Sequence, residues 1–192
     1  LSRIISHLAP VLDAAHPTSA LIYGPTGSGK TVSLIHVLSS FKKVADRHGI
    51  HFQYRYVDLT SPKTYFGALN EVAIALDDSN RKYRKGIPIE YMQTKIIKAI
   101  GDASGYLALL IDEADNIRPN PDMFLTFLGK TLPRKVPCRL ILILLTNRLD
   151  WERTLDPRIL SFLKKTDIIF EPYDAIDLLE ILKLRAQKAL ML

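Results

Sequence analysis

The sequence has a single cysteine, Cys138, among its 192 residues. One thiol cannot form a disulfide framework within the chain, and it cannot supply the set of cysteine ligands on which structural zinc sites depend. The cysteine content therefore favours a reducing, intracellular compartment. Cys138 itself stands next to an apolar run, so we expect it to pack as a small hydrophobic residue.

Long hydrophobic runs are also missing. The longest, at 107–111 and 140–145, fall far short of the roughly 18 apolar residues that a membrane-spanning helix needs. No signal peptide or membrane anchor is visible either. We therefore expect a cytoplasmic protein with no membrane partner.

Apolar residues make up 47% of the chain and charged residues 24%, which is enough to bury one good core but not two large ones. The composition predicts a single α/β domain. The 26 basic and 20 acidic side chains give a net charge of +6, which permits nucleic-acid binding but does not establish it. Because the sequence begins and ends abruptly in helical patterns, we expect it to be an excised fragment.

Short apolar runs alternate with stretches of helical period along the chain. The runs predict five buried strands, at 21–23, 52–59, 107–111, 140–145 and 168–170. The stretches predict helices at 32–47, 65–76, 91–99, 121–132 and 158–164. This alternation predicts an α/β fold in which a five-stranded parallel sheet carries helices on both faces.

A domain boundary is expected after residue 171. Pro172 cannot continue a central strand, and Asp174 can cap the helix that follows. Residues 1–171 would then form the core. The helix expected at 176–190 has an apolar face with little left in the chain to pack against, so 172–192 are interpreted as the start of a second, truncated unit.

A glycine-rich loop of the kind that binds nucleotide phosphates stands between the first expected strand and the first expected helix. It consists of Gly24, Pro25, Thr26, Gly27, Ser28, Gly29, Lys30 and Thr31. Its glycines allow main-chain N–H groups and the helix N-terminus to face a triphosphate closely. We expect Lys30 to reach the β- and γ-phosphates and Thr31 to bind Mg²⁺. A glycine-rich turn without function is the alternative, but it leaves the position of the Lys-Thr pair unexplained.

Two adjacent acids, Asp112 and Glu113, follow a buried strand at the end where open α/β sheets bind ligands. They have the pattern of a Walker B motif. Asp112 would then hold Mg²⁺, and Glu113 would polarise the water that attacks the γ-phosphate. Acids that cap a strand can also form an ordinary solvated turn, and Asp115 is as well suited to capping the next turn as to a role in the site.

The run at 140–145 delivers Thr146 and Asn147 to the same edge of the sheet. Asn147 resembles the sensor 1 residue of AAA+ ATPases. An amide there can hydrogen-bond the γ-phosphate or the attacking water, and so distinguish a triphosphate from a diphosphate. An asparagine at the end of a strand is otherwise usually a turn residue.

Together these motifs resemble the archaeal origin-recognition and helicase-loader family of AAA+ ATPases, over nearly the whole chain. The resemblance rests on Leu-Ile-Tyr-Gly at 21–24, Ile-Asp-Glu-Ala-Asp at 111–115, Thr-Asn-Arg-Leu-Asp at 146–150, Leu-Asp-Pro-Arg-Ile-Leu-Ser at 155–161 and Phe-Glu-Pro-Tyr-Asp at 170–174. It implies a five-stranded AAA+ core, a small helical lid and a winged-helix DNA-binding domain. Only the core and the first lid helix are expected in this chain, and the lid's sensor 2 arginine has no counterpart in it.

The resemblance also implies that Arg158 corresponds to the basic residue near the arginine finger, which in oligomeric AAA+ proteins reaches a neighbour's nucleotide. In clamp-loader relatives the finger follows the serine of a Ser-Arg pair, whereas Phe162 occupies that position here. Arg158 is equally suited to a surface ion pair with Asp156 or Glu152.

The family carries an extra helical element after the second strand that touches DNA, and 60–76 occupy that place. Lys63 and Tyr65 near its start are candidates for phosphate contacts. A second candidate is the basic patch of Arg81, Lys82, Arg84 and Lys85 around Tyr83. An amphipathic helix and a solvated charge run are the alternatives for these two segments.

The function that the resemblance implies is a DNA replication initiator in which ATP acts as a conformational switch and is hydrolysed slowly to ADP and phosphate. This fragment alone is expected to hydrolyse ATP poorly or not at all. ATP or ADP with Mg²⁺ would be its ligands. Duplex DNA, a replicative helicase and other AAA+ subunits would be its partners, and it would associate with the nucleoid. A signal-transducing P-loop scaffold and a mobile-element or clamp-loader-like ATPase are the alternatives.

Overall fold

The computed structural model describes residues 2–15, 17–61, 64–77, 86–118, 121–163, 166–171 and 183. Five parallel strands form one sheet in the order β2-β3-β4-β1-β5. They are β1 (Ala20–Tyr23), β2 (Phe52–Asp58), β3 (Tyr106–Asp112), β4 (Arg139–Thr146) and β5 (Thr166–Ile169). The predicted five-stranded parallel sheet is confirmed, with boundaries close to the expected ranges.

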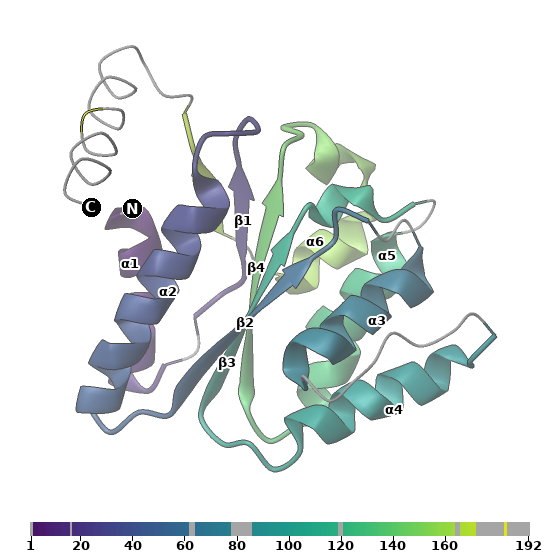
Figure 1. The fold of residues 1–192 in the computed structure, drawn as a ribbon, viewed down its shortest axis with the longest axis horizontal. Coiled ribbons are helices and arrows are strands. Elements are labelled where there is room, and N and C mark those ends of the chain that lie inside the picture. The colour runs from purple at the N-terminus through teal and green to yellow at the C-terminus, as the bar shows by residue number, and fades with distance from the viewer. Residues whose placement is uncertain are drawn as a thin grey trace.

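Helices cover both faces of the sheet, as predicted (Figure 1). On one face lie α1 (Ser2–Leu8) and α2 (Lys30–Arg47). On the other lie α3 (Tyr65–Leu76), α4 (Ile89–Ile100), α5 (Pro121–Thr126) and α6 (Pro157–Leu163). None of these helices has both the length and the apolar character that crossing a bilayer demands. The expected lid helix at 176–190 lies outside the described residues except for Lys183.

One predicted helix is not a continuous α-helix. The stretch 121–132 was expected to be continuous, but α5 ends at Thr126 and is followed by a π-helical turn, Phe127–Thr131, and a 3-10 turn, Leu132–Arg134. Pro133 has no N–H with which to continue an α-helical ladder. The widened turn still keeps Phe127 and Leu132 buried in the core.

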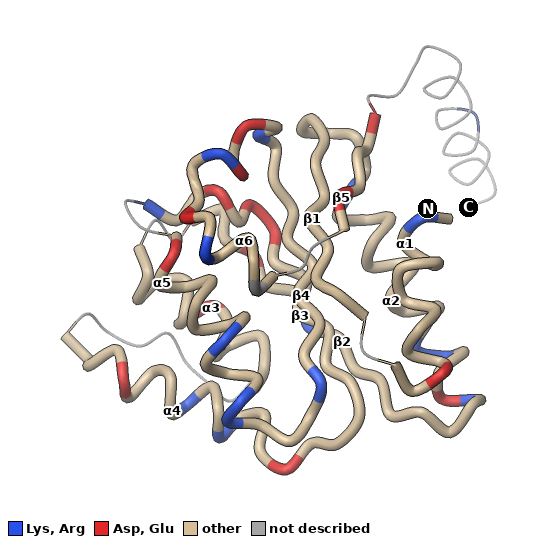
Figure 2. The backbone as a smooth tube through the Cα atoms, turned by 180° about the vertical axis from the view of Figure 1, so that it is seen from behind, with Lys and Arg blue, Asp and Glu red and all other residues tan. Residues whose placement is uncertain are grey.

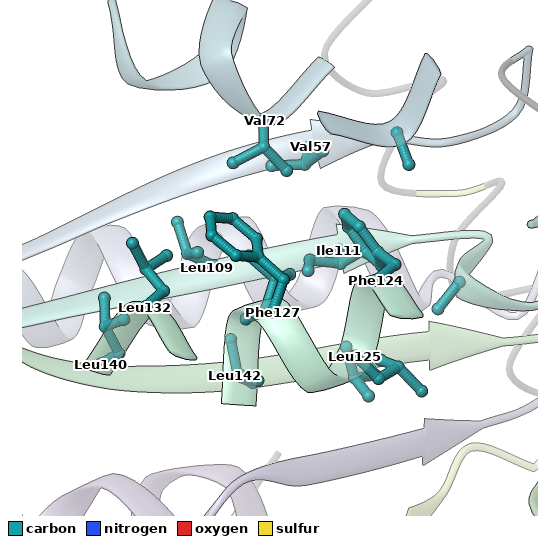
Figure 3. Packing of buried hydrophobic residues seen from close by; sticks show 14 of the residues in the cluster. Val57, Val72, Leu109, Ile111, Phe124, Leu125, Phe127, Leu132, Leu140 and Leu142 are labelled. Atoms are coloured by element: carbon teal, nitrogen blue, oxygen red, sulfur yellow. The ribbon is translucent and has the colours of Figure 1, made fainter. Parts of the chain in front are cut away.

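The three inner strands, β3, β4 and β1, are buried on both faces because helices pack above and below the sheet. Along β3, Tyr106, Ala108 and Leu110 pack on the side of α1 and α2, whereas Leu107, Leu109 and Ile111 pack on the opposite side. Figure 3 shows Phe124 and Phe127 lying over the β3 and β4 side chains on that opposite side. Each fully buried Leu, Ile or Phe side chain stabilises the fold by about 1.5–3 kcal/mol, so this packing fixes the strands and the strand ends that carry the site.

The strand register brings residues that are far apart in the sequence to one edge of the sheet. Tyr23 at the end of β1 lies opposite Thr146 at the end of β4. Asp58 at the end of β2 lies opposite Asp112 at the end of β3. The loop after β1, the acids at the end of β3 and the asparagine after β4 therefore converge at the carboxyl edge, as expected for a parallel sheet.

His7, on α1, is a buried histidine. Its Nε2 atom is buried and has no hydrogen-bond partner among the described residues. Burial lowers the pKa of His7 below its ordinary 6.5, and a hydrogen bond with the Thr18 backbone partly opposes this shift. The neutral ring is therefore the form that the folded chain prefers.

We expect the free energy of unfolding to fall as the pH drops below 6.5, because the unfolded chain binds a proton at His7 before the folded chain does. Well above pH 6.5 the ring is neutral in both states and contributes no pH dependence. Urea unfolding between about pH 7.5 and about pH 5 measures the effect. The fall in the free energy of unfolding with decreasing pH should be smaller in His7→Gln than in the parent. It should be unchanged in His48→Gln, because the His48 ring is exposed at the end of α2. An equal pH dependence in the two variants would contradict the assignment.

Candidate nucleotide-binding site

The glycine-rich loop joins β1 to α2 at the carboxyl edge of the sheet. Gly27 and Gly29 have φ values of 84° and 76°, in the left-handed region that glycine adopts without strain. A Cβ atom at Gly24 would lie 2.7 Å from the carbonyl oxygen of Phe170, so the end of β5 leaves no room for a side chain there. Ser28 closes the loop by donating its hydroxyl to the Pro25 carbonyl at 2.8 Å. This is the conformation that lets successive N–H groups face an anion.

Lys30 is the first residue of α2, and the residue is only 7% exposed, with its ammonium group within the loop. It donates to the carbonyl oxygens of Gly24 at 2.6 Å and Pro25 at 2.9 Å, and to Oδ1 of Asn147 at 2.8 Å. Burial lowers the pKa of Lys30, and the nearby carboxylates of Asp112 and Glu113 oppose that shift. A polyanion bound at the loop would favour the charged ammonium further.

Asp112 is held by donors from three different elements. Its Oδ2 atom accepts the Thr31 hydroxyl at 2.6 Å and the Tyr56 hydroxyl at 3.2 Å, and its Oδ1 atom accepts the Glu113 N–H at 3.0 Å. The hydroxyl and the carboxylate are hard oxygen donors, the chemistry that Mg²⁺ takes from a protein before completing its shell with phosphates and water. Thr31 and Asp112 therefore fit a nucleotide-borne Mg²⁺.

Glu113 has a strained backbone, with φ at 54° in the left-handed region that non-glycine residues rarely adopt. Its Oε1 atom accepts the Asn147 side-chain N–H at 2.6 Å. Strain of this kind costs about 1–3 kcal/mol and is concentrated at functional sites. Here it directs the carboxylate sideways along the edge of the sheet, toward the end of β4.

Asn147 joins the two halves of the site. Its side-chain oxygen accepts from Lys30, and its side-chain nitrogen donates to Glu113. The amide therefore has a fixed orientation between an ammonium group and a carboxylate. A hydrogen-bonded chain from Lys30 through Asn147 to Glu113 links the phosphate loop to the acid after β3.

Asp115 lies beside this chain, 7% exposed, in the 3-10 turn Ala114–Asn116. Its Oδ1 atom is buried and has no hydrogen-bond partner among the described residues. The negative charge of Asp115 opposes the lowering of the Lys30 pKa and contributes to raising the pKa of Arg148. Its influence on the site is thus electrostatic. Figure 2 shows acidic and basic segments close together along the loops at this end of the molecule.

Arg158 lies away from these residues, near the start of α6, and its side chain is 90% exposed. Its guanidinium pairs with Asp156, at 2.7 Å from Nη2 and 3.1 Å from Nε. This is one of the two surface pairings that the sequence left open. Arg158 also lines a groove of about 780 Å³ together with residues of α3, α4 and α5.

The candidate DNA contacts are mostly beyond the described part of the chain, which omits Lys63, Arg81, Lys82, Arg84 and Lys85. Tyr65 begins α3, where Thr64 caps the helix by accepting from the Gly67 N–H at 3.2 Å. The Tyr65 hydroxyl accepts from Gln93 of α4 at 2.8 Å, and its ring packs against the hydrophobic core. These contacts link α3 to α4 through Tyr65, whose predicted contact with DNA stays a prediction.

Two tyrosines at the site were missed from the sequence. Tyr56 of β2 reaches Asp112, and Tyr23 of β1 donates its hydroxyl to Glu152 at 3.0 Å. Burial raises the pKa of Tyr56, and the charge of Asp112 raises it further, so the phenol stays protonated as a donor. The only signal in the sequence was spacing, since Tyr56 stands two residues before the end of its strand on the same face as Asp58.

The fold and the site define a P-loop nucleotide-binding domain of the AAA type. The family model described as AAA domain matches residues 14–150, well over half of the sequence. The chain belongs to this family.

The resemblance to archaeal origin-recognition proteins is also confirmed. The chain is 29% identical over 185 residues to the ORC1-type DNA replication protein of Pyrococcus abyssi, covering 95% of this chain and 44% of that protein. It is 30% identical over 185 residues to the one of Thermococcus onnurineus, covering 95% and 45%. The chain thus spans about half the length of the curated relatives it matches.

Solved structures agree on the fold. The Aeropyrum pernix ORC1 protein in complex with DNA has a TM-score of 0.83 and 28% identity, with 97% of this chain and 48% of that chain covered. Drosophila ORC bound to DNA has a TM-score of 0.66 at 18% identity, which supports the fold alone.

Proposed function

We propose that this chain is the ATP-binding and ATP-hydrolysing core of a DNA replication-origin recognition and helicase-loading initiator. The observation that carries the ATPase part is the hydrogen-bonded chain Lys30–Asn147–Glu113 beside the glycine-rich loop. The replication part is supported by the relatives, which are ORC1-type DNA replication proteins. These relatives favour the initiator over the signalling scaffold and the clamp-loader-like ATPase.

In this proposal each side chain acts where the geometry places it. The loop N–H groups and Lys30 bind the phosphates of ATP. Glu113 takes a proton from the attacking water. The water oxygen then bonds to the γ-phosphorus, and the bond between that phosphorus and the ADP oxygen breaks. Asn147, which contacts both Lys30 and Glu113, would hydrogen-bond the γ-phosphate when ATP is bound and so distinguish ATP from ADP.

Thr31 and Asp112 would hold Mg²⁺, which neutralises phosphate charge when it is bound with the nucleotide. No group of three or more His, Cys, Asp and Glu side chains within the described ranges is arranged to hold a metal ion by itself. A nucleotide-borne Mg²⁺ does not need one, because phosphate oxygens and water supply most of its ligands.

The arginine finger belongs to the same proposal. The exposed guanidinium of Arg158 bonds only its neighbour Asp156 among the pairs that the described residues form, and water screens a surface ion pair of this kind. The energetic barrier to redirecting Arg158 toward another subunit's nucleotide is therefore small. Other AAA+ subunits are the partners that such a role requires.

DNA binding and the lid complete the proposal. The net charge of +6 suits a polyanionic partner, and a solved relative with 28% identity is in complex with DNA. We assign duplex DNA contact to the full-length gene product, with Lys63, Tyr65, Arg81, Lys82, Arg84 and Lys85 as candidate contacts. Residues 172–192 would begin the lid whose angle to the core reports the bound nucleotide. A replicative helicase is the proposed downstream partner, in the cytoplasm at the nucleoid.

Linkage between nucleotide and DNA tests this function. In the full-length gene product, duplex DNA should change the Kd for Mg-ATP by at least about 5-fold, and Mg-ATP should change the Kd for DNA by the same factor. Mg-ADP and DNA should change each other's Kd by a smaller factor. Calorimetry and fluorescence anisotropy at two salt concentrations measure both sides of the cycle. Normal nucleotide binding with no DNA response at any salt would reject the initiator and favour the signalling scaffold.

A further inference from the structure

Tyr56 reaches the site because of the alternation of side chains along β2. Phe52 and Tyr54 pack in the hydrophobic cluster on the side of α1 and α2, so Tyr56, in the same alternation, projects from that face. Asp112 follows Ala108 and Leu110 of β3, which pack in the same cluster. Both side chains therefore emerge on the face where α2 begins.

The register of the sheet then sets their separation. Tyr56 lies opposite Leu110, two residues before the pair of Asp58 and Asp112. A tyrosine is long enough to span this diagonal between neighbouring strands. Its hydroxyl donates to Oδ2 of Asp112 at 3.2 Å, the same oxygen that accepts Thr31 at 2.6 Å.

The donors around Asp112 leave little freedom to its carboxylate. The Glu113 N–H at 3.0 Å fixes Oδ1, while Thr31 and Tyr56 approach Oδ2 from α2 and β2. Thr31 and Glu113 belong to the two motifs read from the sequence. Tyr56 belongs to neither, and it comes from a strand to which no role in the site was assigned.

We propose that Tyr56 is a positioning residue for the magnesium site, holding the Asp112 carboxylate in the orientation in which it accepts the metal. The inference rests on the proposed function, since it concerns the Mg²⁺ that accompanies the nucleotide. Partners of this type, which bond a ligating carboxylate from outside the ligand set, typically contribute 10- to 100-fold to metal affinity. With 37% of its surface exposed, Tyr56 fills no core position that the loss of a hydroxyl would disturb.

The test is the Mg²⁺ dependence of ADP binding by the 192-residue chain, compared between the parent, Tyr56→Phe and Tyr54→Phe. Phenylalanine keeps each ring and removes only the hydroxyl. Tyr54 is the matched control, because it lies on the same strand and face but packs against the hydrophobic cluster. ADP affinity is measured first in EDTA and then across a Mg²⁺ titration.

In Tyr56→Phe the Mg²⁺ concentration for half-maximal enhancement of ADP binding should rise about 10-fold, while the affinity in EDTA stays at the parent value. Tyr54→Phe should match the parent in both. If Tyr56→Phe also matches the parent in the titration, the positioning role is wrong. If the parent binds no ADP with or without Mg²⁺, the proposed function itself fails, which is a different result.

Discussion

Glu113→Gln should slow ATP hydrolysis about 10³-fold, equivalent to about 4 kcal/mol in the barrier, while ATP binding is kept. The glutamine side chain retains an oxygen that can accept the hydrogen bond that Asn147 now donates to Glu113 at 2.6 Å. It cannot accept a proton from water. The substitution therefore removes the base without removing the hydrogen bond that orients it.

Single-turnover hydrolysis of Mg-ATP in the full-length gene product measures this effect, with Kd for Mg-ATP determined in parallel. Glu90→Gln is the matched control, since it makes the same chemical change in the first turn of α4, remote from the carboxyl edge. An unchanged rate in Glu113→Gln would remove Glu113 from the role of base. Equal losses of binding and rate would mean that the residue only maintains the site.

The strain at Glu113 has a physical explanation in this scheme. With the left-handed φ of 54°, the Glu113 carboxylate lies 2.6 Å from the side-chain nitrogen of Asn147. The strain of about 1–3 kcal/mol is sustained by the fully buried strand that precedes it. Substitutions at Lys30, Asn147 and Glu113 should accordingly be non-additive, because the three side chains form one network.

The sequence predicted the sheet well because its signals are local. Each apolar run of the central strands is buried on both faces, so it is continuous in the sequence and its ends are easy to locate. The glycine-rich loop was readable for the same reason: its eight residues are consecutive and lie where a strand gives way to a helix. The residues at the ends of β3 and β4 could then be placed at the same edge from strand direction alone.

Other features depend on register and packing, which local patterns do not encode. The contact of Tyr56 with Asp112 needs the strand pairing of β2 and β3, and the contact of Tyr23 with Glu152 crosses 129 positions. The apolar spacing at 121–132 predicts one continuous helix, whereas α5 ends at Thr126 and a π-helical turn keeps Phe127 and Leu128 buried in the core. The left-handed backbone at Glu113 could not be predicted either, because the residue with this conformation is not a glycine.

Lys30→Ala should weaken Mg-ATP binding about 100-fold, which corresponds to about 2.7 kcal/mol. The ammonium group of Lys30 is the only positive charge in residues 24–31. It donates hydrogen bonds to two loop carbonyls and to Asn147. Its replacement removes a charge-assisted hydrogen bond to phosphate and leaves Asn147 without its donor. Lys42→Ala is the matched control, since Lys42 lies on the same helix and its side chain is exposed.

Calorimetric titration of the 192-residue chain and its Lys30→Ala variant with Mg-ATP tests the central claim most directly, because that claim is a phosphate site at the carboxyl edge of the sheet. The account predicts binding of one nucleotide to the parent and to Lys42→Ala, and about 100-fold weaker binding to Lys30→Ala. Equal affinity of the parent and Lys30→Ala would contradict the assignment of the glycine-rich loop as the phosphate site, and with it the roles derived for Asn147, Glu113 and Asp112.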